Sequence, residues 1–337
     1  MTDSPPQERF AAARSGDKQA LNDLVEPYRA ELLVHCYRLL GSMQDAEDMV
    51  QETFLRAWDR LDQFVGGQYF RAWLYKIATN LCLDALDKRA RREISTVIFS
   101  ASDPRGAIAP VITDPIWLDP FPDDRLPDAA LSPEARYMQR ESISLAFLAA
   151  LQHLPPRQRA ILILCDVLDW RAREVAQMLE ITVASVNGLL RRARSTMNHS
   201  YHKKESVVSA DTQLSAVLKR YVEAWESGDV EGLIALLTDK VIFTMPPSPA
   251  WYWGREAVRV HAQSMFSQRK YQRWRLQPTQ ANNQLAFACY RYDEADGLYY
   301  AHALQVLTFD DTQITDVHMF LLTAIFPYFG LSMTLTS

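Results

Sequence analysis

The sequence contains no hydrophobic run long enough to cross a membrane. A membrane-spanning helix needs roughly 20 predominantly apolar residues, and polar residues interrupt every apolar stretch of the chain. The N-terminal segment from Met1 to Arg9 also lacks the apolar block of a secretion signal. We therefore expect a cytoplasmic protein that does not associate with a membrane.

Cysteine is scarce, and its spacing excludes the usual metal and disulfide patterns. Cys36, Cys82, Cys165 and Cys289 lie far apart in apolar surroundings. They form neither a C-x-x-C pair nor a Cys/His cluster with the spacing of a zinc site. We expect buried, reduced thiols, and we assign no metal and no cofactor to this chain.

A basic excess is also missing, since the net charge is −5. Taken alone, this balance argues against binding to nucleic acid, but it averages over segments of opposite sign. The 337 residues exceed a usual domain of about 100–150 residues, so we expect two or three domains.

Proline divides the chain into blocks. Residues 8–92 and 133–204 have apolar residues at helical spacing and predict two all-α domains. Residues 211–330 begin with helices and continue as aromatic and β-branched strands, which predicts an α+β domain. Residues 93–132 form an acidic linker, in which prolines interrupt any helix. These prolines are Pro104, Pro110, Pro115, Pro120, Pro122 and Pro127.

Four linker residues are unusually apolar for a solvated tether. They are Ile116, Trp117, Leu118 and Phe121. This pattern leaves two interpretations open: a spacer, or a segment that docks onto a neighbouring surface.

The segment from Asp45 to Trp58 predicts a helix with two distinct faces. The apolar face consists of Val50, Phe54, Trp58 and, beyond the segment, Leu61. The opposite face carries Asp45, Asp48 and Glu52. An acidic face does not bind DNA, so it is either solvated or a docking surface for a protein.

Aromatic and cationic residues alternate on helical turns after Phe70. This combination suits unpaired bases, which stack on rings, together with phosphates, which bind cations. The competing interpretation places Trp73, Leu74, Ile77 and Leu81 in the core. The candidate residues are Arg71, Trp73, Lys76, Lys88, Arg89, Arg91 and Arg92.

The motifs D-A-E-D-x-V-Q-E-T-F-L-R-A-W and F-R-A-W-L-Y-K-I-A-T-N resemble region 2 of sigma-70 factors of the extracytoplasmic-function (ECF) group. The resemblance implies that the acidic helix binds the clamp helices of RNA polymerase, through Asp45, Asp48, Gln51 and Glu52. It also implies that the following helices melt and read the −10 promoter element. Phe64, Ile77 and Asn80 would surround a flipped base, under the loop 65–69.

The second block predicts a helix-turn-helix that starts at Ala172. Its expected buried positions are Val175, Leu179, Ile181, Val186 and Leu189, with the small Ala176 where the helices cross. Glu180 departs from the pattern, because this turn often takes glycine or another residue that tolerates positive φ. The recognition helix would have Thr182 as its cap and span residues 183–197.

The exposed side of this recognition helix is polar and basic. We expect Ser185 and Asn187 to reach base edges. The arginines would neutralise phosphates, although a solvated helix end is the alternative. These arginines are Arg171, Arg173, Arg191, Arg192 and Arg194. The motifs L-P-P-R-Q-R-A-I-L-I-L and S-V-N-G-L-L-R-R-A-R resemble sigma region 4, which binds the −35 element and the polymerase flap.

The third block resembles SnoaL-like members of the NTF2-like superfamily, whose cone encloses a pocket. Ketosteroid isomerase shares this fold, but its general base would fall near Met245 and Pro246, where no acid is present. A hydrogen-bond donor such as Tyr221 cannot abstract a proton without a base, so we expect binding and not catalysis. The pocket candidates are Tyr221, Trp251, Tyr252, Trp253, His261 and Gln305.

The sequence therefore predicts a multidomain ECF sigma factor, with two all-α sigma domains and a C-terminal α+β NTF2-like cone. Its expected partners are core RNA polymerase, promoter DNA and, for the cone, a small-molecule or intramolecular ligand. The resemblance implies that the cone itself modulates sigma activity. The alternatives are a one-component ligand-responsive DNA-binding regulator and an isomerase or hydrolase.

Overall fold

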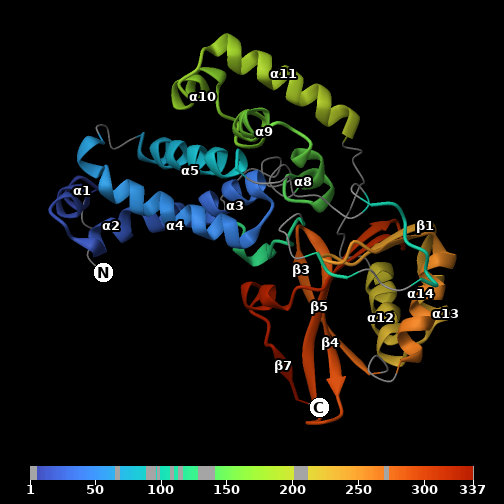
Figure 1. Ribbon diagram of the computed structural model, residues 1–337. Helices are drawn as coiled ribbons and strands as arrows, with labels where there is room; N and C mark the ends of the chain where they lie inside the picture. Colours follow the sequence, from blue (N-terminus) through green and yellow to red (C-terminus); the bar gives the residue numbers. More distant parts are fainter. Residues whose placement is uncertain are drawn as a thin grey trace. The chain divides into compact units, whose positions relative to one another are not determined.

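The computed structural model describes residues 6–64, 69–88, 96, 99–106, 110–112, 117–127, 141–200, 212–268 and 273–336. The chain divides into two compact units, Met1–Arg92 with Arg125–His202, and Glu93–Asp124 with Lys203–Ser337 (Figure 1). Among the helices that are described, none has the length and apolar character needed to cross a membrane. The predicted fold class, two all-α domains and one α+β domain, is confirmed.

The N-terminal half of the first unit is a helical bundle. Its helices are α1 (Pro6–Arg14), α2 (Lys18–Val25), α3 (Arg29–Leu40), α4 (Met43–Asp59) and α5 (Phe70–Leu86). Gly41 ends α3 in the left-handed region, with φ of 70°, where glycine has no steric penalty. The Ser42 hydroxyl then accepts a hydrogen bond from the Asp45 amide at 3.3 Å and caps α4.

The C-terminal half of the same unit carries the predicted helix-turn-helix. Its helices are α8 (Leu145–Gln152), α9 (Pro156–Leu162), α10 (Ala172–Met178) and α11 (Val183–Ser200), with a π-turn at Ile163–Val167. Thr182 caps α11 by accepting from the Ser185 amide at 3.1 Å, as predicted. Of the expected buried positions, Val175 and Val186 are buried, whereas Leu179, Ile181 and Leu189 are only half-buried. Leu190 is buried in place of Leu189, because the helix turns Leu190 toward the core.

The two helical halves are held together by buried arginines. Arg159 is 2 % exposed, and it donates to the Leu39 carbonyl at 2.5 Å and to Gln152 Oε1 at 2.7 Å. Arg38 donates to the Ser142 hydroxyl at 2.7 Å. A buried cation is costly unless hydrogen bonds compensate it, so these contacts belong to one packed unit.

The second unit is a curved sheet with helices on one side (Figure 1). The helices are α12 (Thr212–Ser227), α13 (Val230–Ala235) and α14 (Arg255–Ser267), and a 3₁₀ segment spans Thr323–Phe329. The strands are β1 (Leu237–Thr244), β2 (Trp251–Trp253), β3 (Trp274–Ala281), β4 (Gln284–Asp293), β5 (Leu298–Asp310), β6 (Gln313–Phe320) and β7 (Thr334–Leu335).

The strand order is β2-β1-β6-β5-β4-β3, and β7 pairs with β5. The β1–β6 pair is parallel, and the other pairs are antiparallel. The core between the sheet and α12 to α14 includes Tyr221, Trp225, Phe243 and Phe287, all less than 9 % exposed. The strand β7 therefore extends this domain beyond the predicted end at residue 330.

The four cysteines are free thiols. Cys36, Cys82 and Cys289 are buried, as expected, and burial raises the pKa of the Cys289 thiol. Cys165 is half-buried, which corrects the expectation for that residue: it lies in the π-turn next to the charged Asp166.

Candidate functional site

The predicted acidic face of α4 lies on the surface of the first unit. Asp48 and Gln51 are exposed, whereas Asp45 and Glu52 are partly buried. Glu52 accepts from Arg56 Nε at 2.8 Å, one helical turn away. The face therefore presents carboxylates, one of which already has a cationic partner.

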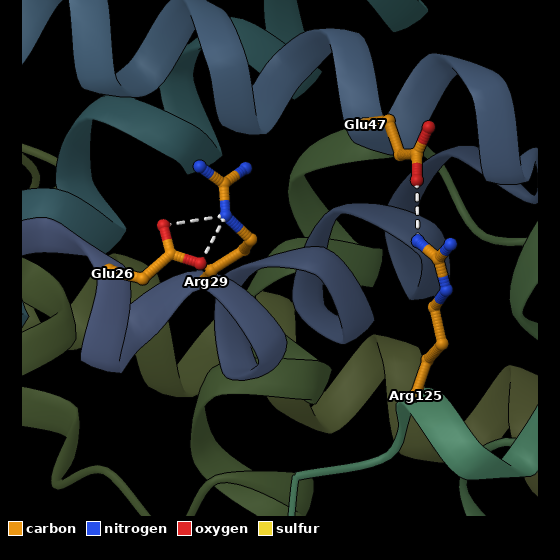
Figure 2. A network of polar contacts seen from close by, with 4 residues as sticks. All are labelled: Glu26, Arg29, Glu47 and Arg125. Atoms are coloured by element: carbon orange, nitrogen blue, oxygen red, sulfur yellow. Dashed lines mark hydrogen bonds and ion pairs between the residues drawn. The ribbon is translucent and has the colours of Figure 1, made fainter. Parts of the chain in front are cut away.

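Two residues next to this face were not selected from the sequence. Leu55 is 62 % exposed and follows Asp48 by two turns, so an apolar side chain lies within the acidic face. Glu47 accepts from Arg125 Nη1 at 2.6 Å (Figure 2). The helical pattern could have pointed to Leu55, but the distant Arg125 gave no local signal.

A cavity of about 230 Å³ lies beside α5. Four residues that were predicted to bind the −10 element line it: Trp73, Lys76, Ile77 and Asn80. Its other lining residues are Arg56, Arg60 and Gln63, from the end of α4 and the turn that follows. Sequence reasoning missed these three, because their position opposite α5 depends on how the two helices pack.

Phe64 is not among the residues that line this cavity. It is 6 % exposed, and its ring centroid lies 4.9 Å from Trp73 and 5.4 Å from Phe70. Phe64 therefore packs against Trp73, which does line the cavity. The loop 65–68 and the predicted DNA-binding residues Arg89, Arg91 and Arg92 lie outside the described residues, and Lys88 is exposed.

The cations of α5 are paired with carboxylates. Arg71 makes a bidentate pair with Glu31 on α3, with Nη2 to Oε2 at 2.7 Å. Lys76 Nζ lies 2.6 Å from Glu180 Oε1, in the turn of the helix-turn-helix. Each of these two cations, which we predicted to contact DNA, has a carboxylate partner in this conformation.

The recognition helix α11 exposes the predicted polar residues. Ser185, Asn187, Arg191 and Arg192 are all exposed, as are Arg171 and Arg173 beside α10. Arg194 differs, because it forms a bidentate pair with Asp166 at 2.6 and 2.9 Å. Arg194 is thus partly neutralised, unlike the other predicted phosphate-binding residues of α11.

Part of the linker packs within the second unit, which confirms the docking interpretation for three of its four apolar residues. Trp117, Leu118 and Phe121 are at most 3 % exposed; Ile116 lies outside the described residues. The Phe121 amide donates to Asn282 Oδ1 at 2.8 Å, and its carbonyl accepts from the Asn282 amide at 2.9 Å. Pro122 forms a β-bridge with Ala281 at the end of β3.

The linker also contacts the opposite edge of the sheet. The Ser102 amide donates to the Trp251 carbonyl on β2 at 2.8 Å, and Trp251 Nε1 donates to the Phe99 carbonyl at 2.8 Å. The strands β2 and β3 are the two ends of the strand order. The linker therefore supplies hydrogen-bond partners at both sheet edges, which would otherwise present unpaired backbone groups.

The interior of the second unit holds four of the predicted pocket residues, Tyr221, Tyr252, His261 and Gln305, and their contacts are partly polar. The Tyr221 hydroxyl donates to Gln305 Oε1 at 2.9 Å, and burial raises the pKa of Tyr221 well above its usual value. His261 stacks on Tyr252 at 4.4 Å, and burial lowers the pKa of His261 to about 4. Within the described ranges, Gln305 Nε2 and His261 Nε2 have no hydrogen-bond partner.

Two of the pocket candidates lie elsewhere. Trp253 is 60 % exposed, because alternate residues of β2 point to opposite faces, so it does not line the interior. Trp251 contacts the linker, as described above. Met245, near which the resemblance placed the isomerase base, is buried, and no three His, Cys, Asp or Glu side chains among the described residues form a metal site.

Comparison with protein families defines the class of this architecture. Residues 9–92 match sigma-70 region 2, residues 144–197 match sigma-70 region 4, and residues 218–317 match the SnoaL-like domain. The chain is 41 % identical over 324 residues to the ECF RNA polymerase sigma factor SigG of Mycobacterium tuberculosis, covering 95 % of this chain and 85 % of SigG. This protein belongs to the family of ECF RNA polymerase sigma factors.

More distant relatives agree with this assignment. The chain is 26 % identical over 191 residues to SigW of Bacillus subtilis, covering 57 % of this chain and 94 % of SigW. The crystal structure of SigJ of Mycobacterium tuberculosis has a similar fold, with a TM-score of 0.59 at 24 % identity. That match covers 92 % of this chain and 99 % of SigJ, so the fold similarity extends through the C-terminal domain.

Proposed function

We propose that this sigma factor binds core RNA polymerase, recognises a promoter with its two helical domains and starts transcription. The observation that carries the proposal is the cavity beside α5, which combines an aromatic ring, an apolar floor and polar groups. A flipped base needs these features, since the base stacks on a ring while its edge is read by hydrogen bonds. Such a protein works in the cytoplasm, where bacterial DNA lies.

The acidic face of α4 is the proposed contact with polymerase. Exposed carboxylates steer a partner of opposite charge, and a central apolar residue adds the desolvated contact on which interfaces depend. Asp48, Gln51 and Glu52 supply the polar part, with Asp45 at the edge. Leu55 supplies the apolar part, so we propose it as an anchor of this interface.

Promoter recognition is divided between α5 and α11. In the cavity, Asn80 is the proposed reader of the flipped base and Trp73 its stacking partner, with Ile77 as the floor. On α11, Ser185 and Asn187 face base edges in the major groove. Arg171, Arg173, Arg191 and Arg192 bind phosphates of the −35 element, and Arg194 contributes less because Asp166 already neutralises it.

The C-terminal domain is the proposed regulator, and its ligand is the linker of its own chain. Trp117 and Phe121 are buried, and the Phe121 backbone hydrogen bonds to Asn282 in the β3–β4 turn. Holding this linker limits how far the two helical domains can separate. We propose no catalysis here, because a tyrosine donor without a carboxylate base cannot abstract a proton.

Transcription reconstituted from purified components tests the proposal. Core polymerase with this chain, on fragmented DNA of the same organism, is expected to give discrete transcripts that core polymerase alone does not give. Asn80→Ala should abolish open-complex formation and leave affinity for core polymerase intact, whereas the matched variant Asn22→Ala on exposed α2 should behave like the wild type. Specific DNA binding with no dependence on polymerase would instead favour a one-component regulator.

A further inference from the structure

The residues that flank α10, the first helix of the helix-turn-helix, contact α5 on both sides: Trp170 before the helix and Glu180 after it. Asp169 precedes it and Glu180 follows it, each with φ of 56°. Residues with a side chain seldom adopt this left-handed conformation, and asparagine or aspartate does so more readily than glutamate. The turn that should favour glycine thus carries a glutamate, and this departure needs an explanation.

At the N-terminal end of α10, Trp170 covers two residues of α5. Its ring centroid lies 5.2 Å from that of Tyr75, and the Arg71 guanidinium carbon lies 5.9 Å from the Trp170 ring and 5.0 Å from the Tyr75 ring. The Trp170 amide donates to the Leu164 carbonyl at 2.9 Å, which fixes this residue's backbone. Arg71 is therefore held by aromatic rings and by Glu31 together.

At the C-terminal end of α10, Glu180 reaches Lys76. The Lys76 Nζ to Glu180 Oε1 distance is 2.6 Å, and Lys76 also lines the cavity beside α5. The hydrogen bond and the charge of Lys76 lower the pKa of Glu180, so Glu180 is ionised at neutral pH. A carboxylate thus binds the cation that we propose for DNA.

We propose that Glu180 is an internal competitor of promoter DNA, whose carboxylate binds Lys76 where a phosphate would otherwise bind, with Trp170 covering Arg71 beside it. This inference rests on the proposed role of α5 in binding the −10 element. It explains why a glutamate occupies a turn position that strains its backbone. Glycine would relieve the strain but would leave Lys76 open to any nucleic acid.

The contact belongs to the free protein and cannot persist on a promoter. The −10 and −35 elements are separate stretches of promoter DNA, and each base pair between them adds about 3.4 Å of B-form helix. Two surfaces that touch within 2.6 Å cannot bind both elements at once. Separating the halves must also break the buried Arg159 contact, whereas the Glu180 pair is exposed and a phosphate can replace it directly.

Binding of the full-length protein to a single-stranded oligonucleotide tests the competition. The probe is fluorescein-labelled DNA of mixed sequence, about 12 nucleotides long, and the measurement is fluorescence anisotropy at low salt. Glu180→Gln keeps the size of the side chain and removes its charge. Because an exposed ion pair contributes little, we expect roughly two- to fivefold tighter binding. Trp170→Ala should add a further gain of similar size.

A double-mutant cycle separates competition from a general change of charge. The gain from Glu180→Gln should disappear in the Lys76→Gln background, and the control Asp23→Asn on α2 should leave affinity unchanged. Equal affinity of Glu180→Gln and wild type, or the same gain in both backgrounds, would overturn the competition. If Lys76→Gln has no effect in the Glu180→Gln background, the proposed DNA contact of α5 is wrong instead. If Glu180→Gln proves unstable, Glu180→Gly serves as the second variant, because glycine adopts the left-handed backbone at this position without strain.

Discussion

The two surfaces that we propose for DNA differ in how their cations are paired. On α5, Arg71 pairs with Glu31 and Lys76 pairs with Glu180. On α11, Arg191 and Arg192 are exposed, and neither has an ion pair within the described ranges. The difference suggests an order of events: α11 can bind phosphates in the free protein, whereas α5 becomes available after its carboxylate partners are displaced.

The largest effect should come from weakening the contact of α4 with polymerase, because α5 and α11 are then no longer brought to the promoter. Reversing the charge of Asp45, Asp48 and Glu52 together should weaken binding to core polymerase by about 4 kcal/mol, roughly a thousandfold, because like charges then face each other. The free variant should still bind duplex DNA through α11 and melt at a similar temperature. Titration against core polymerase measures the effect, and unchanged affinity would refute the docking role of α4.

Releasing the linker tests whether it controls access to both surfaces. Phe121→Ala removes a fully buried ring and should destabilise the C-terminal unit by about 3 kcal/mol. It should also change transcription by reconstituted polymerase, because the linker joins α5 to the second helical domain. The comparison variant Phe10→Ala, at a half-buried ring in the first unit, should leave the C-terminal unit intact. Transcription at the wild-type rate after release of the linker would argue against the regulatory role.

The unpaired cations of α11 should govern the salt dependence of duplex binding. Arg191→Ala with Arg192→Ala should weaken binding to all sequences about tenfold and lower the salt slope by about 2, since each phosphate contact releases counterions. Arg194→Ala should lower the slope less, because Asp166 already neutralises that guanidinium. Equal slopes for the double variant and the wild type would show that Arg191 and Arg192 do not contact phosphates.

A smaller effect should distinguish the histidine that contacts α5 from the histidine of α11: only the first should make stability depend on pH. His35 hydrogen bonds to Thr79 of α5 at 2.8 Å, and burial, with help from Arg38 and Arg71, lowers the pKa of His35 to about 3. Below about pH 6.5 the unfolded chain binds a proton at this histidine, whereas the folded protein binds it only near pH 3. The free energy of unfolding therefore decreases as the pH is lowered from about 6.5 to about 3.

The slope from this one histidine is about 1.4 kcal/mol per pH unit. Urea unfolding followed by far-ultraviolet circular dichroism at several pH values measures it, and His35→Gln should remove this contribution. By contrast, the histidine of α11, His199, is exposed and should have little effect when replaced. A wild-type slope that persists in His35→Gln would assign the acid sensitivity to other groups.

Much of the site could be predicted because it depends on local patterns. The period of 3.6 residues assigned α4, α5 and α11 and separated their buried from their exposed faces. Asp48, Gln51, Asn80, Asn187 and the arginines of α11 are exposed as that pattern predicts. The polarity of a helix face follows from neighbours three and four residues away, so no long-range information was needed.

The pairing of these residues could not be predicted in the same way. Lys76 and Glu180 are separated by 104 positions in the chain, and no local rule links them. The pairing of Arg194 with Asp166 could not be predicted either, because the π-helical turn that contains Asp166 is not evident in the sequence. The predicted cavity lining was incomplete for the same reason, since Arg60 and Gln63 reach the cavity from the end of α4 and the turn that follows it.

The sequence by itself determined the domain order, the helical faces and the family, because each depends on residue types at short spacing. The tertiary structure alone decided which charges are neutralised and where the linker lies. Asn282 shows the reason: its left-handed backbone, with φ of 57°, is a local property that a turn sequence suggests. Its hydrogen bonds to Phe121, however, join positions 161 residues apart, and only the packing of the sheet brings those two segments together.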